Sequence, residues 1–200
     1  MPTSARTLTL PALNKQRVLI FSMLWLLSIA PFFLLHQQLI TGPFVNAILI
    51  LTCVLLGPTE AMIIGLFPSV VALTNGLLPI QLAPMVPFIM ISNAVYVGVF
   101  YLLGKKPMIP RQPKQPTNSS ASLVPLVSLV PLVTSVVLAS ILKFAFLILT
   151  AKFLIAPLLH GPIVNTLITM MGWPQLVTAL IGGAIAIGIL APFRTNQRSQ

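Results

Sequence analysis

The chain has 200 residues, of which 57% are hydrophobic and only 6% are charged, and its mean hydropathy is +1.03. These values exclude an ordinary soluble domain and are typical of an integral membrane protein. Eleven Lys and Arg residues stand against a single acid, Glu60, which gives a net charge of +10. In a soluble protein this balance would suggest nucleic acid, but nine of the eleven basic residues lie in polar flanks of apolar segments. The charge is therefore assigned to membrane topology.

Catalytic and metal chemistry find little support in the sequence. The sequence has one cysteine, Cys53, which lies in an apolar segment. A single cysteine excludes an intrachain disulfide and a cysteine-based metal site. The two histidines are isolated from carboxylates and from this cysteine. The sequence contains no H-E-x-x-H motif, no acidic pair and no phosphate-binding loop, and no serine is paired with a well-placed histidine and aspartate. We expect a protein that is not an enzyme and that binds no cofactor or metal.

Six apolar segments follow one another along the chain, and each is predicted to be a membrane helix. They cover about 17–36, 43–57, 58–75, 84–104, 127–156 and 174–193. The first continues past a Ser-Ile-Ala sequence that loosely resembles a signal-peptidase site, so it is interpreted as an uncleaved membrane helix. Three Gly-Pro pairs, at 42–43, 57–58 and 161–162, are each expected to start a helix. Proline at the first helical position loses no hydrogen bond.

The basic residues test the count of six spans independently. Nine of them precede the first helix, lie at 105–114 or follow the last helix, so six spans place all nine on one side of the membrane. By the positive-inside rule that side is the cytoplasm, and both termini lie there. The predicted organisation is a cytoplasmic tail at 1–16, a six-helix domain at 17–193 with a basic Pro-rich cytoplasmic loop at 105–123, and a cytoplasmic tail at 194–200.

The segment 43–57 leaves one alternative open. Its length as a helix, about 22 Å, is short of the ~30 Å hydrocarbon core, so it either crosses the membrane or forms a re-entrant hairpin with 58–75. Glu60 lies at the cytoplasmic surface in the first case and near the middle of the membrane in the second. We favour the surface, because the Gly-Pro-Thr-Glu sequence that ends at Glu60 is a good helix start. A carboxylate in a first turn also complements the helix dipole.

Lys143 lies near the middle of the fifth apolar segment, within LVPLVTSVVLASILKFAFLILTAKFLI. An ammonium at the centre of a membrane helix costs about 2.5 to 3.5 kcal/mol on translocon-based scales, so it should face protein or a water-filled cavity rather than lipid. Glu60 is expected at the opposite surface and is not placed to neutralise it. A bound anion would do so, and we therefore expect Lys143 to bind a solute.

Other polar residues are expected in the outer half of the predicted bundle, where they would line one cavity with Lys143. The motif Thr41-Gly-Pro-Phe-Val-Asn46 is echoed at His160-Gly-Pro-Ile-Val-Asn165; each is either a polar lining for a ligand or only a convenient helix start. Asn93 is a ligand or an interhelical hydrogen bond, and Trp173 is a stacking ring or an interfacial residue. The predicted substrate-binding residues are Asn46, Asn93, Lys143, Asn165, Trp173, Gln175 and Thr178.

Small residues gather on the last segment, where Thr178, Gly182 and Ala186 lie four apart with Gly183 and Gly188 nearby. Such faces let helix backbones approach closely. Their ordinary use is packing within the bundle, and docking of a partner subunit is the alternative.

The order of the motifs resembles a known family. ITGPFVNAI, LGPTEAMIIGLFPSVVAL and LPIQLAPMVPFIMISNA are followed by a basic loop and then by ASILKFAFL and WPQLVTALIGGAIA. Over about residues 17–193 this is similar to the substrate-binding S components of energy-coupling-factor (ECF) importers, and more closely to a group of S-component-like proteins. The resemblance implies a six-helix bundle in the bacterial plasma membrane that binds a vitamin or other micronutrient from outside. It also implies a transmembrane coupling subunit and two ATPases as partners, which use the ATP.

Two functions of different classes follow from these observations. The first is the substrate-binding membrane subunit of an ECF-type ABC importer. The second is a non-transporting accessory or structural membrane subunit, in which Lys143 pairs with an acid on a partner protein. A cavity of roughly several hundred Å³ lined by the predicted residues would favour the first, and a filled core would favour the second.

Overall fold

The computed structural model describes residues 15–34, 37–108 and 124–196, which form helices and no strand. In chain order the elements are α1 (Lys15–Leu34), α2 (Gln38–Leu55), α3 (Pro58–Ile64), α4 (Phe67–Thr74), η1 (Ile80–Met85), α5 (Val86–Met108), α6 (Val124–Thr150), the π-helical turn η2 (Ala151–Ile155), η3 (Ala156–Leu158), α7 (Ile163–Met171) and α8 (Trp173–Asn196). Most of the predicted tail at 1–16 and of the loop at 105–123, and the end of the tail at 194–200, lie outside the described residues.

The predicted all-helical class is confirmed for the described residues. Among the described residues, five stretches are long and apolar enough to cross a membrane: Lys15–Leu34, Gln38–Leu55, Ile80–Gly104, Val130–Leu158 and Ile163–Ala191. A chain this apolar favours helices because each helix satisfies its own backbone hydrogen bonds without help from water.

The third predicted span differs from the other five. The apolar stretch Pro58–Thr74 is shorter than a membrane-length helix, and it is divided into α3 and α4 at Gly65 and Leu66. Pro68 lies in the first turn of α4, where its missing N–H interrupts no intrahelical bond. The sequence Gly-Leu-Phe-Pro thus ends α3 and starts α4.

Two of the three Gly-Pro pairs start helices as predicted. Pro58 opens α3, and Pro162 caps α7. The prediction is wrong for Pro43, which lies inside α2, a helix that begins at Gln38. The helix starts earlier because residues left unwound in an apolar environment would each lose backbone hydrogen bonds, whereas a proline near the helix start removes one.

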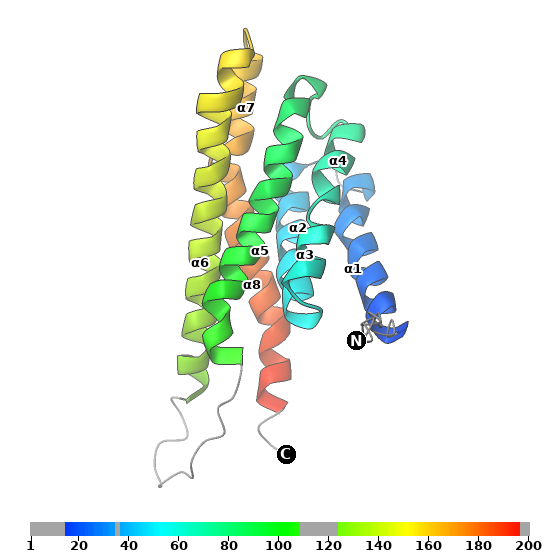
Figure 1. Cartoon of the computed structure of the whole chain (residues 1–200), viewed down its shortest axis with the longest axis vertical. Helices are drawn as coiled ribbons and strands as arrows, with labels where there is room; N and C mark the ends of the chain where they lie inside the picture. The colour runs from blue at the N-terminus through cyan, green and yellow to red at the C-terminus, as the bar shows by residue number, and fades with distance from the viewer. Residues whose placement is uncertain (1–14, 35–36, 109–123, 197–200) are drawn as a thin grey trace, which may run out of the picture.

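The chain runs back and forth along the long axis of the bundle (Figure 1). The start of α1, the turn from α2 to α3, the end of α5, the start of α6 and the end of α8 lie at the lower end in this view. We call this the basic end, because the helices there begin or end in Lys15, Arg17, Lys105, Lys106 and Arg194. The connections from α4 to α5 and from η3 to α7 lie at the opposite end.

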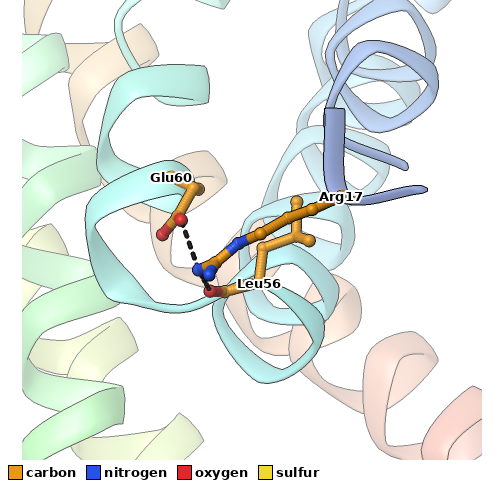
Figure 2. Close-up of polar contacts among 3 residues, drawn as sticks. All are labelled: Arg17, Leu56 and Glu60. Carbon is orange, nitrogen blue, oxygen red and sulfur yellow. Dashed lines mark hydrogen bonds and ion pairs between the residues drawn. The ribbon is translucent and has the colours of Figure 1, made fainter. Parts of the chain in front are cut away.

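The only acid of the chain, Glu60, lies at the basic end in the first turn of α3, as predicted for a helix start. Figure 2 shows the Arg17 guanidinium between this carboxylate and the end of α2. Arg17 Nη2 donates to Glu60 Oε1 at 2.6 Å and to the Leu56 carbonyl at 2.5 Å. The last carbonyls of a helix lack intrahelical donors, so Arg17 satisfies one of them while pairing with the acid. These contacts fasten the start of α1 to the turn between α2 and α3.

Helices α2, α5, α6 and α8 form the centre of the bundle, and α1 packs at its periphery against α2, α3 and α4. Glycines allow α8 to approach closely. A Cβ on Gly182 would lie 2.6 Å from both Asn46 Cβ and the Pro43 carbonyl of α2. A Cβ on Gly183 would overlap the Val136 side chain of α6. The small residues at 182 and 183 are therefore used for packing within the bundle.

We predict that Gly182→Ala destabilises the protein by about 1–3 kcal/mol, because the added methyl overpacks the contact between α8 and α2. Thermal unfolding of the purified protein in detergent measures the change. Gly188→Ala is the matched control, because a Cβ at that position on the same helix meets nothing within 4 Å. It should leave stability unchanged or raise it slightly, since alanine favours helix over glycine. Equal effects of the two substitutions would contradict the close contact.

Candidate ligand-binding site

Lys143 of α6 reaches side chains from two other helices. Its Nζ donates to Asn46 Oδ1 of α2 at 2.6 Å and to Asn93 Oδ1 of α5 at 2.8 Å. The lysine is 3% exposed and both asparagines are buried. We call these three residues the lysine–asparagine cluster. It joins positions that are 97 and 50 residues away from Lys143 in the sequence.

Each asparagine is oriented by a hydrogen bond from its amide nitrogen. Asn46 Nδ2 donates to the Gly42 carbonyl at 2.9 Å, one turn earlier in α2. Asn93 Nδ2 donates to the Gly65 carbonyl at 2.8 Å, and Gly65 caps the C-terminal end of α3. Because each nitrogen is used in this way, each amide oxygen faces the ammonium. The break between α3 and α4 therefore supplies the acceptor that orients Asn93.

The positive charge of Lys143 is hydrogen-bonded but not neutralised by a carboxylate side chain of the chain. The only such carboxylate is Glu60, which binds Arg17. The Tyr96 ring, whose centroid lies 5.3 Å from Lys143 Nζ, adds a cation–π contact. An ammonium has three N–H donors, and among the described residues only the two amide oxygens accept from it. One donor and the whole charge remain available to a ligand.

A cavity of about 90 Å³ lies beside the cluster. Its wall is formed by parts of α1, α2, α4, α5, α6, α7 and α8. The polar side chains in the wall are Gln38, Thr41, Asn46, Ser69, Asn93, Lys143 and Gln175, and most of the others are apolar. The volume is below the several hundred Å³ that we expected of a solute-binding cavity and below the roughly 300–1,000 Å³ of sites for drug-sized ligands, so the volume alone does not favour the first of the two functions. In this conformation the cavity admits a short chemical group next to Lys143.

The cavity extends from the cluster away from the basic end. Gln38 precedes Asn46 by eight residues in α2, so it lies about 12 Å further along the helix. Gln38 Nε2 and Gln175 Nε2 both donate to the carbonyl of Met170, at 3.2 and 3.3 Å. These two half-buried side chains therefore join α2 and α8 to the end of α7 at the outer part of the cavity.

Four of the seven predicted residues line this cavity, namely Asn46, Asn93, Lys143 and Gln175. The other three do not. Thr178 is buried, but it packs on Gly42, whose Cβ would lie 2.8 Å from the threonine methyl, and its hydroxyl donates to the Gln175 carbonyl. Thr178 is thus a packing residue between α8 and α2.

Asn165 and Trp173 also lie outside the cavity, and both are exposed. In α7 the buried face carries Leu167 and Met171, four residues apart. Asn165 lies two residues before Leu167, about 200° around the helix, so it points away. Trp173 opens α8 and is 59% exposed, as an interfacial residue would be. Asn46 and Asn165 therefore share a sequence motif, but only Asn46 lies in the cavity wall.

Gln38, Thr41 and Ser69 also line the cavity and were not predicted. The expected helix start at residue 43 concealed the first two. A helix from Gln38 places residues 38, 41, 42, 45 and 46 on one face, because positions three and four apart are neighbours. Ser69 follows Pro68 in the shortest apolar segment, and a lone serine in such a segment gives no signal of the direction it faces.

Among the described residues no three His, Cys, Asp or Glu side chains come together as a metal site. Comparison of the chain with family models, curated proteins and solved structures found no match. The resemblance to ECF S components therefore stays a prediction.

We predict that Asn93→Leu destabilises the protein by about 1.5–3 kcal/mol, because it removes one acceptor from a buried ammonium. In a Lys143→Met background, where no charge needs that acceptor, the same substitution should cost less than half as much. Thermal unfolding of the four proteins completes this double-mutant cycle. Additive losses would show that the amide and the ammonium are not coupled.

Proposed function

We propose that this protein is the substrate-binding membrane subunit of an importer and holds a small solute at Lys143. The observation that carries the proposal is a buried ammonium, bonded to two amide oxygens and facing a cavity, with no carboxylate side chain of its own chain to neutralise it. Intramembrane ionisable residues commonly mark substrate pathways, because an unneutralised charge is costly to keep.

The burial of Lys143 supports a solute over a partner protein. In the accessory-subunit alternative, an acidic side chain of another protein would have to reach an ammonium that is 3% exposed within this bundle. A small molecule needs only the cavity that already adjoins the lysine. The oriented amides also favour binding, since they hold the ammonium in one place before a ligand arrives.

In this proposal the basic end faces the cytoplasm of a bacterial plasma membrane, following the positive-inside rule. The chain then crosses six times, with α3 and α4 as a broken third pass, and both tails are cytoplasmic. Non-helical backbone at membrane depth is tolerated where it lines a cavity, which suits the break at Gly65. The cavity, which extends away from the basic end, would receive its solute from outside.

We further propose that transport energy comes from partner subunits of the ECF type. The chain contains no phosphate-binding loop, so ATP would be hydrolysed by two ATPases attached through a transmembrane coupling subunit. The order of motifs that resembles S components supports this assignment, and the solute would be a vitamin or another micronutrient.

The test is native mass spectrometry of the gently purified protein, which detects a co-purified small molecule. We predict that Lys143→Met loses this molecule, or binds it at least tenfold more weakly, while the protein still reaches the membrane. Lys152→Met is the matched control, because Lys152 is an exposed lysine nine residues later that does not line the cavity. It should retain the solute.

Retention of the solute by Lys143→Met would overturn the proposal. So would a wild-type protein that carries no small molecule but co-purifies with another membrane protein in a Lys143-dependent manner, which is the outcome expected of an accessory subunit.

A further inference from the structure

The charge of the cavity wall limits the charge of the ligand. Lys143 is the only charged side chain among the described residues that line it. A ligand with one negative charge leaves the filled site neutral. A dianion such as a phosphate monoester would instead leave a net negative charge in a wall that is mostly apolar, where an unpaired charge is strongly unfavourable.

Two hydrogen-bond donors in the cavity wall remain available to a ligand. One is the third N–H of Lys143, which finds no acceptor among the described residues. The other is the Ser69 hydroxyl of α4, which is buried, lines the cavity and has no hydrogen-bond partner in the described part of the chain. Buried hydroxyls are almost always hydrogen-bonded, so an unpartnered one in a cavity wall points to a missing acceptor. Two donors suit the two oxygens of a carboxylate.

The rest of the wall favours an apolar body of limited size. Phe32, Leu78 and Met171 contribute hydrophobic surface from three different parts of the chain. The cavity volume, about 90 Å³, is below the ~150 Å³ of an apolar cavity that binds benzene. A short hydrocarbon segment next to the carboxylate therefore fills the space in this conformation.

We infer that the cavity recognises the carboxylate of a small monocarboxylate with an apolar body, with Lys143 supplying the charge and Ser69 a second donor. This inference rests on the proposed function and specifies its substrate class. The amides of Asn46 and Asn93 position the ammonium, because their oxygens accept from Lys143 while their nitrogens donate to backbone carbonyls.

Three four-carbon probes separate the chemistry of this class from its alternatives. Butyrate is a monoanion with an apolar tail, butyramide is its neutral counterpart, and succinate replaces the terminal methyl with a second carboxylate. Calorimetric titration of the full-length protein in detergent should give saturable butyrate binding. The affinities for butyramide and for succinate should be at least tenfold lower.

Variants of the protein assign the roles of the two donors. Lys143→Met should weaken butyrate binding at least tenfold, and Ser69→Ala should weaken it about three- to tenfold without lowering the melting temperature, since it removes a hydroxyl that has no partner. Ser92→Ala is the control, because Ser92 is buried in the same bundle but donates to the Ile89 carbonyl and does not line the cavity. It should leave butyrate binding unchanged.

The outcomes distinguish this inference from the proposed function. Equal or tighter binding of butyramide or succinate would overturn the monocarboxylate class. Absence of butyrate binding, with a co-purified solute still lost in Lys143→Met, would overturn the class and leave the solute-binding function standing. If neither butyrate nor a co-purified solute depended on Lys143, both would fall. A loss of stability in Ser69→Ala with unchanged binding would remove Ser69 from the site.

Discussion

The hydrogen bonds from Lys143 to Asn46 and Asn93 are the contacts on which the arrangement of the central helices depends. A buried ammonium is tolerated only when acceptors surround it, and each bond to a charged group contributes about 1.5–3 kcal/mol. The two acceptors lie on different helices, so α2, α5 and α6 must lie at set distances from one another. Gly182 extends this constraint to α8, because its missing side chain leaves room for Asn46.

The irregular third segment follows from the same constraint. A continuous helix through residues 58–74 would use the Gly65 carbonyl for its own ladder, whereas the break at Gly65 presents that carbonyl to Asn93. The new helix start also places Ser69 at the cavity wall. The short segment 58–74 thus contributes to the site twice, through the carbonyl of Gly65 and through the Ser69 side chain of α4.

The sequence was informative where a polar group is costly in an apolar segment. Lys143 and Asn93 stand out for that reason alone, and the cluster they form with Asn46 agrees with the prediction that these residues lie together. Gln38 and Thr41 were not predicted as cavity residues, because the helix was expected to start at Pro43 and not at Gln38. Asn165 was wrongly predicted to line the cavity, because a shared motif does not determine which face of a helix is buried. The cavity volume depends on side chains from many elements at once, which no local pattern encodes.

The fastening of α1 at one end has a mechanical consequence. Arg17 holds the start of this peripheral helix, and Phe32, fifteen residues later, forms part of the cavity wall. The lever arm between them is about 22 Å, so a tilt of about 5° pivoting on the guanidinium moves the phenyl ring by about 2 Å. Because α1 contributes no hydrogen bond to Lys143, such a tilt would change the width of the cavity and leave the ammonium bonded to its two amides.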